Sequence, residues 1–231
     1  MKNKNISLKN TFYVQSIDKH LTYEWLLYKH YAKCIPNIMY SFGLYDINNI
    51  LQAICCYGTP ANNHNNNLGD FKMIELVRLV SNENLPKNTL SYFLAKTFKL
   101  LPDNLSLISY ADKGKNHSGY IYQATNWIYT GLGGGVDFYI NQDNKEIHSR
   151  IMSDYRKKFP NETRAEIADK LKWKKVKGTY KHRYFNFIGN KRNKKKWLNQ
   201  LKDKYKIKEY PKNKNINYDA SYKTLNQTKL F

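Results

Sequence analysis

Side chains able to carry out acid–base chemistry gather between Ser109 and Tyr129. Ser109 can donate a hydrogen bond to a carbonyl oxygen, and Asp112 can accept a proton. Tyr122 and Tyr129 lie in the same stretch. Two alternatives stay open: Ser109 also fits a satisfied core hydroxyl, and Asp112 also fits a cap on the turn after a strand. These four residues form the candidate catalytic group.

Polar residues outside this stretch are candidates for binding rather than catalysis. Arg78 interrupts an apolar run and fits either a phosphate or a structural carboxylate partner. Asn88 and Ser91 stand at the start of a predicted helix, where anions bind. His30 and His117 are the two histidines in the polar motifs, but no HxH or CxxC spacing accompanies them. The sequence therefore leaves a metal requirement open.

The spacing of apolar residues predicts the elements that must position these side chains. Alternating or continuous apolar runs predict strands, and apolar residues three and four apart predict helices. The predicted strands are 11–17, 38–45, 50–57, 71–80, 105–110, 145–152 and 184–188, and the predicted helices are 21–33, 88–101, 119–129 and one that begins at Thr163. This order predicts an α/β fold in which a mixed sheet carries helices on both faces.

Boundary signals divide the chain. Asn88 is a good N-cap, and Thr163 with Glu166 matches a capping box. Residues 62–69 are a loop of Asn, His and Gly, and the chain is polar after about residue 210. We expect one catalytic domain over residues 1–210, with a basic part at 150–210, and a polar tail at 211–231.

The charge is strongly positive: 39 Lys and Arg against 18 Asp and Glu give +21 over 231 residues. A compositional bias toward Lys, Asn, Ile and Tyr explains the lysines but not the shortage of acidic residues. The alternative is a polyanionic partner, above all nucleic acid. Aromatic residues at 15% and apolar residues at 41% exclude a wholly disordered basic protein.

The order of elements resembles the N-acetyltransferase (GNAT) fold. In that fold two neighbouring parallel strands splay apart, and acyl-coenzyme A lies between them. The pair here would be 71–80 and 105–110, with Arg78, Asn88 and Ser91 beside the coenzyme. The chain departs from the family pattern at 81–87, because the usual Q/R-x-x-G-x-G/A loop is replaced by a segment without glycine.

A more specific resemblance is carried by SYAD at 109–112 followed by HSGYIYQATNWIYTG at 117–131, together with ELVRL at 75–79. These motifs, in this order, resemble the Mom family of phage DNA-modification proteins over residues 12–190. The resemblance implies conversion of the exocyclic amine of adenine in double-stranded DNA to a methylcarbamoyl or acetamido-type derivative. Such a change shields phage DNA from host restriction enzymes, in the cytoplasm of a bacterial host.

The GNAT resemblance implies acetyl-coenzyme A as the donor. Acetyl transfer alone does not give a carbamoyl product, so an extra step or a metal is also implied. Adenine must leave the duplex to react. Tyr57 and Trp127, like Tyr122 and Tyr129, can stack on a base, and Asn126 is of the type that pairs with the adenine edge. For phosphate contacts we expect Lys194, Lys195 and Lys196.

Two other functions compete with this one. An ordinary N-acetyltransferase acting on a small-molecule or protein amine would explain the fold but not the charge. A basic DNA-binding protein without catalysis would explain the charge but not the clustering of Ser109, Asp112 and Asn126 at predicted element ends. No run of about 18 apolar residues is present, so we expect no membrane partner. No apolar segment follows the charged N-terminus, so we expect no signal peptide.

Overall fold

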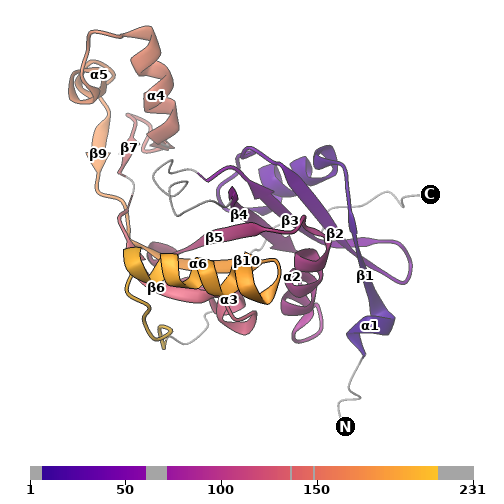
Figure 1. Cartoon of the computed structure of the whole chain (residues 1–231). Helices are drawn as coiled ribbons and strands as arrows, with labels where there is room; N and C mark the ends of the chain where they lie inside the picture. Colours follow the sequence, from indigo (N-terminus) through magenta and orange to yellow (C-terminus); the bar gives the residue numbers. More distant parts are fainter. Residues whose placement is uncertain (1–6, 61–71, 136, 148, 213–231) are drawn as a thin grey trace.

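A computed structural model describes residues 7–60, 72–135, 137–147 and 149–212. Seven strands of this part form a mixed sheet in the order β1-β2-β3-β4-β5-β10-β6 (Figure 1). All neighbours are antiparallel except β4 and β5, which run parallel. The strands are β1 (Phe12–Ser16), β2 (Tyr40–Asp46), β3 (Leu51–Gly58), β4 (Lys72–Ser81), β5 (Leu105–Asp112), β6 (Ile128–Gly133) and β10 (Lys181–Ile188). The predicted mixed sheet is confirmed.

Helices cover both faces of this sheet, as predicted. On one face Phe93 and Leu94 of α2 (Thr89–Leu100) pack in a cluster that also holds Tyr122 of α3 (Tyr120–Ala124). On the other face Trp197 and Leu201 of α6 (Lys191–Lys204) pack in a second cluster. A third cluster on that second face holds Trp25 and Leu26 of the short helix η2 (Trp25–Lys29), which follows η1 (Lys19–Thr22). The sheet is thus the middle of three layers.

The parallel strands β4 and β5 pair over only part of their length. Their register runs from Lys72 opposite Leu105 to Glu75 opposite Ile108. Beyond it both strands continue, but they no longer pair with each other. On the other side of β4 the register with β3 shifts, because Tyr57 lies opposite Leu76 while Cys56 lies opposite Arg78. Val77 is therefore the extra residue of a β-bulge, which bends a strand and increases its twist. The strands separate at this bulge, as the GNAT resemblance implies.

Residues 138–176, here called the arm, form a small unit inserted between β6 and β10. It has its own sheet in the order β8-β7-β9 and its own apolar cluster around Tyr139, Met152 and Ile167. Figure 1 shows the arm extending away from the main sheet. Its elements are β7 (Phe138–Ile140), β8 (Glu146–Ile147), α4 (Ser149–Lys158), α5 (Arg164–Lys170) and β9 (Lys174–Val176). The two connecting segments, 133–135 and 177–180, are called the neck.

Three predicted elements differ from the structure. The helix predicted over 21–33 is a 3₁₀ turn followed by a π-helix, and it ends at Lys29. The helix predicted over 119–129 ends at Ala124, and Ile128 begins β6. The strand predicted over 145–152 is only Glu146–Ile147, after which α4 begins.

The second of these differences has a clear cause in a Schellman motif. Asn126 has φ 59°, and its N–H donates to Gln123 O while the N–H of Trp127 donates to Tyr122 O. This pair of bonds ends a helix on a left-handed residue, usually glycine. The Tyr122 and Trp127 rings, 5.1 Å apart, supply the accompanying apolar contact.

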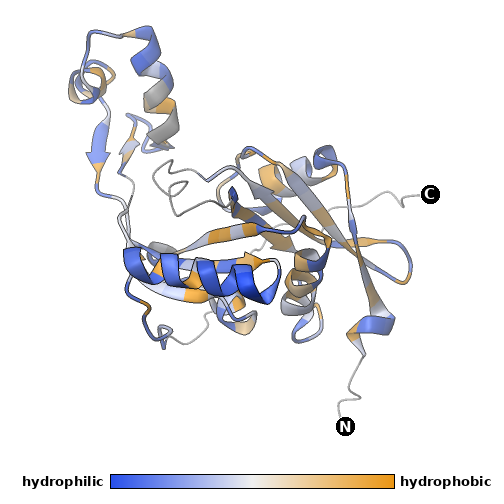
Figure 2. Cartoon of the chain, in the orientation of Figure 1, coloured by the Kyte–Doolittle hydropathy of each residue, from blue (hydrophilic) through white to orange (hydrophobic). Residues whose placement is uncertain are grey.

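Other boundary predictions hold. The capping box of Thr163 and Glu166 is present at α5. By contrast, α6 was not predicted, because only Trp197 and Leu201 of its residues are buried and its outward face is hydrophilic (Figure 2). The predicted loop at 62–69 and almost all of the predicted tail lie outside the described residues. Within those residues, no helix has the length and apolar character needed to cross a bilayer.

Gly58 at the end of β3 allows a close backbone approach that any side chain would block. A Cβ there would lie 1.9 Å from the carbonyl oxygen of Asn37. We predict that Gly58→Ala lowers the unfolding free energy by about 1–3 kcal/mol, because backbone must move to admit the methyl group. Thermal unfolding measures this as a fall in Tm of several degrees. Gly134→Ala is the matched control, since a Cβ at Gly134 meets nothing within 4 Å; equal Tm values for the two variants would contradict the prediction.

Candidate active site

Ser109 and Tyr122 meet where β4 and β5 separate. Ser109 Oγ lies 2.9 Å from the carbonyl oxygen of Leu76 and 2.8 Å from the hydroxyl oxygen of Tyr122. A hydroxyl has one proton, so when Ser109 donates to Leu76, Tyr122 donates to Ser109. Both side chains are buried. The structure thus brings two of the predicted catalytic residues, Ser109 of β5 and Tyr122 of α3, into direct contact where β4 and β5 separate.

Tyr122 is held as a neutral phenol. Burial raises the pKa of Tyr122 above its ordinary value, and the hydrogen bond with Ser109 opposes this only in part. Its ring lies 5.1 Å from the rings of both Trp127 and Tyr184. A buried, protonated hydroxyl in aromatic surroundings is a proton or hydrogen-bond donor, the role that a leaving group or a developing oxyanion requires.

Tyr129 belongs to a second hydrogen-bonded pair on the same face of the sheet. Its hydroxyl lies 2.8 Å from Nδ1 of His182, and its ring lies 5.0 Å from that of Tyr184. His182 is 5% exposed, and its Nε2 is buried with no hydrogen-bond partner among the described residues. Burial lowers the pKa of His182. No motif in the sequence marks His182, and it lies outside the strand predicted over 184–188, since β10 begins at Lys181.

Arg78 lies just beyond the bulge. Its Nη1 donates to the Val77 carbonyl at 2.7 Å and its Nη2 to Cys34 Sγ at 3.2 Å. Its Nε is buried and has no hydrogen-bond partner in the described part of the chain. The guanidinium thus satisfies the backbone of the bulge, and its buried Nε–H is the donor for which the described residues supply no acceptor. Its predicted contact with coenzyme phosphate stays a prediction.

His30 is a neutral imidazole near Arg78 and His117. Burial is the largest cause that lowers the pKa of His30 to about 3, and the positive charges of Arg78 and His117 add to it. Nδ1 of His30 accepts a hydrogen bond from the Ala32 N–H at 3.0 Å. A neutral ring whose Nδ1 accepts carries its proton on Nε2, so His30 offers a donor at neutral pH.

Sequence reasoning left a metal open at His30 and His117. In the described ranges, no three His, Cys, Asp or Glu side chains come together as a metal site would require. Tyr31 lies between the two histidines, with ring centroids 4.3 Å from His30 and 6.2 Å from His117. His30, Tyr31 and His117 therefore form an aromatic contact group, and the metal role predicted for the two histidines stays a prediction.

The loop between β4 and α2 lacks glycine, but asparagines take left-handed conformations in its place. Asn84 has φ 60° and Asn88 has φ 67°. Asn is the residue that adopts this conformation most readily after glycine. Asn88 is the N-cap residue, as predicted, but its side chain makes no capping bond; its carbonyl accepts from Ser91 Oγ instead. Coenzyme binding by Asn88 and Ser91 stays a prediction.

The same loop is tied to the other layer by a buried lysine. Nζ of Lys29, which is 2% exposed, donates to Asn82 Oδ1 at 2.7 Å and lies 5.3 Å from the Trp25 ring centroid. Burial lowers the pKa of Lys29. Lys29 therefore fixes the first residues after β4, the segment that leads into the N-terminus of α2.

Asp112 makes the contacts of a cap. Its Oδ1 accepts from the Gly114 N–H at 2.9 Å and from Thr179 Oγ1 at 2.7 Å. Thr179 belongs to the neck, so the carboxylate joins the end of β5 to the base of the arm. The capping alternative for Asp112 is therefore present in the structure, and its predicted catalytic role stays a prediction.

The predicted base-binding residues lie in different environments. Tyr57 is fully buried, with its hydroxyl 2.7 Å from Thr97 Oγ1, and Trp127 is fully buried beside Tyr122. Neither ring face is open to a base in this conformation. Asn126 is exposed and ends α3 through its left-handed backbone. The roles of these three residues in adenine binding stay predictions.

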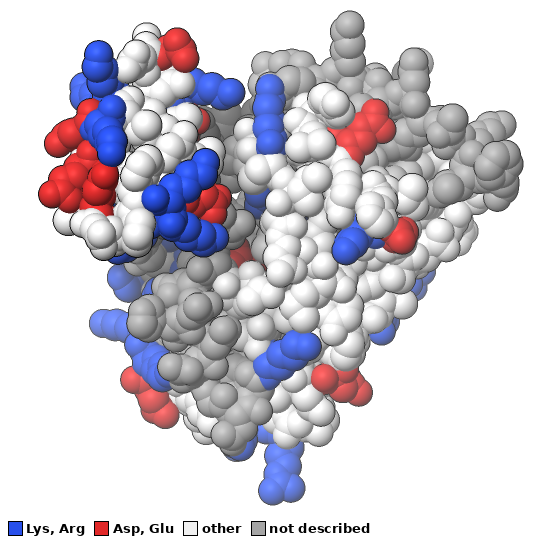
Figure 3. Space-filling model, turned by 90° about the horizontal axis from the view of Figure 1, so that it is seen from above, with Lys and Arg blue, Asp and Glu red and all other residues white. Residues whose placement is uncertain are grey.

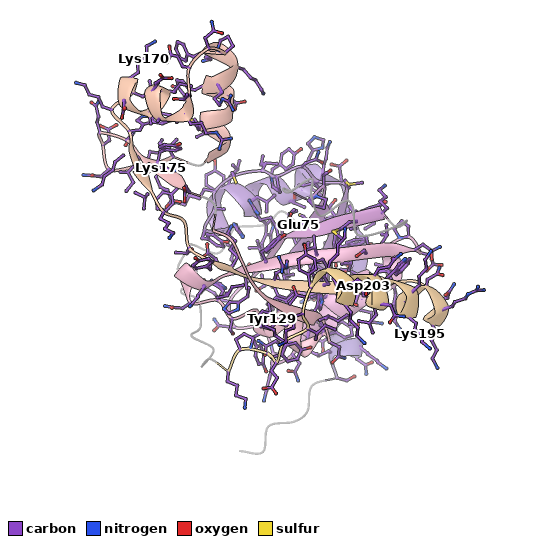
Figure 4. All side chains as sticks on the ribbon, turned by 60° about the vertical axis from the view of Figure 1, so that its left-hand side comes forward. Glu75, Tyr129, Lys170, Lys175, Lys195 and Asp203 are labelled. Carbon is purple, nitrogen blue, oxygen red and sulfur yellow. The ribbon has the colours of Figure 1, made fainter. Side chains whose placement is uncertain are left out.

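Lys194, Lys195 and Lys196 lie on the exposed side of α6. Figure 4 shows Lys195 and Asp203 on this helix, away from the arm that carries Lys170 and Lys175. Residues 191–212 hold ten Lys and Arg against two Asp and Glu. Residues 137–180, which include the arm, hold eleven Lys and Arg against seven Asp and Glu. In Figure 3, blue and red side chains intermingle over the arm. The segment formed by α6 and the residues that follow it therefore has a larger excess of positive charge than the arm and neck.

Comparison with known proteins gives one family and several fold likenesses. A model of the Mom protein family matches residues 11–212. No curated protein matches the chain significantly. Similar solved structures include a protein assigned as a phosphinothricin N-acetyltransferase (12% identity, TM-score 0.47, covering 78% of this chain and 100% of that one). Another is spermidine/spermine N-acetyltransferase SpeG from Vibrio cholerae (8% identity, TM-score 0.46, 84% and 99%). With TM-scores below 0.5, these likenesses carry no argument about chemistry.

The depressed pKa of His30 has a measurable consequence for stability. The folded chain binds fewer protons at His30 than the unfolded chain between about pH 6.5 and pH 3, so stability falls as pH falls through this window. The loss is at most about 1.4 kcal/mol per pH unit. We predict that His30→Gln flattens this dependence, as measured by urea unfolding at pH 7, 6, 5 and 4. Parallel curves for wild type and variant would contradict the assignment.

Proposed function

The chain belongs to the Mom protein family, and from this premise we propose that it modifies the exocyclic amine of adenine in double-stranded DNA with an acyl-derived group. The observation that carries the proposal is the contact between Ser109 and Tyr122 at the separation of β4 and β5. This contact places a protonated phenol, hydrogen-bonded to a serine, at the point where two parallel strands separate. Protection of phage DNA from restriction is the role that we propose for the product.

The acceptor sets the chemical demands. The adenine amine is a poor nucleophile, because its lone pair is delocalised into the ring, and a proton must leave it during acyl transfer. Burial keeps Tyr122 neutral, and its one proton becomes available to the acyl oxygen or the leaving group when Ser109 donates to Tyr122 instead of to the Leu76 carbonyl. Ser109 orients Tyr122 through their shared hydrogen bond. Neutral His182, bonded to Tyr129, is a group of the right type to take the proton.

Acetyl-coenzyme A is the proposed donor and would supply the acyl carbon as a thioester. The residues that fit its phosphates are Arg78, with one unpartnered Nε, and the backbone at the start of α2 after Asn88. Lys29 and Asn82 hold the intervening loop in place. The left-handed asparagines give this loop the sharp backbone turns that glycines give in ordinary GNAT enzymes.

DNA is the proposed macromolecular partner, and the surface of α6 and residues 205–212 is its proposed electrostatic contact. This surface has ten cationic residues in 22 positions and two acidic ones. Lysines on an exposed helix face contact phosphates without reading sequence. The target context must then come from the cleft or from other contacts.

Ser109→Ala tests the catalytic part. We predict that the variant still binds acetyl-coenzyme A in calorimetry but loses at least about tenfold in modified deoxyadenosine, because the Ala side chain cannot hold Tyr122. Mass spectrometry of nucleosides from plasmids in expressing cells measures the product. Ser106→Ala is the matched control, since Ser106 is buried in the same strand and its hydroxyl has no hydrogen-bond partner in the part of the chain described. Unmodified DNA with acetylated protein in the wild-type cells would instead indicate an ordinary N-acetyltransferase.

Substitution of Lys194, Lys195 and Lys196 tests the proposed contact with DNA. We predict that replacing all three by Ala weakens binding to any duplex and reduces the slope of log affinity against log salt by about 2–3, because each phosphate contact contributes about 0.9. Fluorescence anisotropy at several salt concentrations measures the slope. The control replaces Lys157, Lys170 and Lys175, which are ion-paired with Asp154, Glu162 and Asp137 in and beside the arm. Equal slopes for the two triple variants would remove α6 from the interface.

A further inference from the structure

The neck combines features that neither the catalytic cleft nor the α6 surface explains. Tyr180 is 50% exposed although it is a large aromatic residue. It directly precedes β10, and exposed Lys113 and Lys177 lie in the segments around it. An exposed aromatic side chain among lysines is the combination that stacks on a base while the lysines contact phosphates.

The backbone under Tyr180 is firmly held. The Tyr180 carbonyl accepts from the Lys113 N–H at 3.2 Å. One residue earlier, Thr179 donates to Asp112 at 2.7 Å. On the other neck segment, a Cβ at Gly135 would lie 2.4 Å from the Gly178 carbonyl, so the two segments pass each other closely. The Gly178 N–H also donates to Asp137 Oδ1 at 3.2 Å. A rigid backbone with an exposed ring loses little entropy when the ring binds.

The neck also lies at the right place relative to the cleft. Asp112, which holds it, is three residues beyond Ser109 on the same strand, a separation of about 10 Å at the rise of an extended chain. The Asp112 carbonyl also accepts from the N–H of His117, which is near His30 at the cleft. A duplex that delivers a base to Ser109 and Tyr122 would therefore run beside Tyr180.

We propose that the neck is a DNA-contacting surface, in which Tyr180 stacks into the duplex beside the target adenine and so favours its extrusion toward Ser109 and Tyr122. Asp112 is then a positioning residue that fixes the neck through Thr179. This inference rests on the proposed function. A side chain that enters the base stack is needed only while the adenine is paired, because a single strand presents the base already unstacked.

The difference between paired and unpaired substrate gives the test. Rates of adenine modification are measured by nucleoside mass spectrometry on a duplex oligonucleotide and on its single target strand. We expect Tyr180→Ala to lose about tenfold or more on the duplex and less than about twofold on the single strand. Tyr180→Phe keeps the ring and should keep the duplex rate. Tyr13→Ala, which removes an exposed tyrosine on the far edge strand β1, is the control and should retain both rates.

Three further variants address Asp112. Thr179→Val removes the donor and Asp112→Ala removes the acceptor of the bond between the neck and β5, so both should raise KM for the duplex while the pH profile of kcat is unchanged. Asp112→Asn keeps an acceptor oxygen, so it should retain both the duplex and the single-strand rate. Loss of the single-strand rate in Asp112→Asn alone would overturn the positioning role and return Asp112 to catalysis. Wild-type duplex rates in both Tyr180→Ala and Thr179→Val would overturn the neck assignment. Failure of wild type on both substrates would instead remove the proposed function, and the neck assignment with it.

Discussion

The separation of β4 from β5 is the constraint on which the rest of the site depends. A parallel pair normally continues its ladder to the strand ends, but here the ladder stops at Glu75 and Ile108. The bulge at Val77 is the local cause, because one extra residue against β3 bends β4 away from its other neighbour. Two buried strands that separate leave backbone groups without ladder partners, and such groups must find others.

The side chains that find them are the same ones that can do chemistry. Ser109 donates to the Leu76 carbonyl, and Arg78 donates to the Val77 carbonyl. The hydrogen bond to the backbone fixes the position of each of these side chains. Each also makes a second polar contact, Ser109 with Tyr122 and Arg78 with Cys34. A side chain held by the backbone in this way is preorganised, and preorganised dipoles contribute most to the stabilisation of a transition state.

Sequence patterns predicted the sheet well, because buried strands such as β3 and β4 are almost continuously apolar. They failed where asparagine takes the place of glycine. Asn126 ends a helix that apolar spacing alone extends to residue 129, and Asn84 and Asn88 take left-handed conformations in a loop that has no glycine. The contact of Ser109 with Tyr122 follows from the motif, whereas the pairing of Tyr129 with His182 needs the register of β6 against β10, which the sequence alone does not give.

The sequence gives the number of charged residues, but it does not show which of them form ion pairs or where the unbalanced positive charge lies. The segment after residue 150 is rich in Lys and Arg along its length, but in the folded chain its two parts, the arm and α6, differ in how many of these residues have acidic partners. In the arm, Lys170 pairs with Glu162 and Lys157 with Asp154, while Glu166 is used to cap α5. In α6 the single acidic residue, Asp203, stands among seven cationic ones. An ion-paired lysine has less to gain from a phosphate, since it must give up its partner first. In the proposed interface, the long-range attraction for DNA is therefore assigned to α6, and the arm, which has a smaller excess of positive charge, and its neck are assigned shape and stacking.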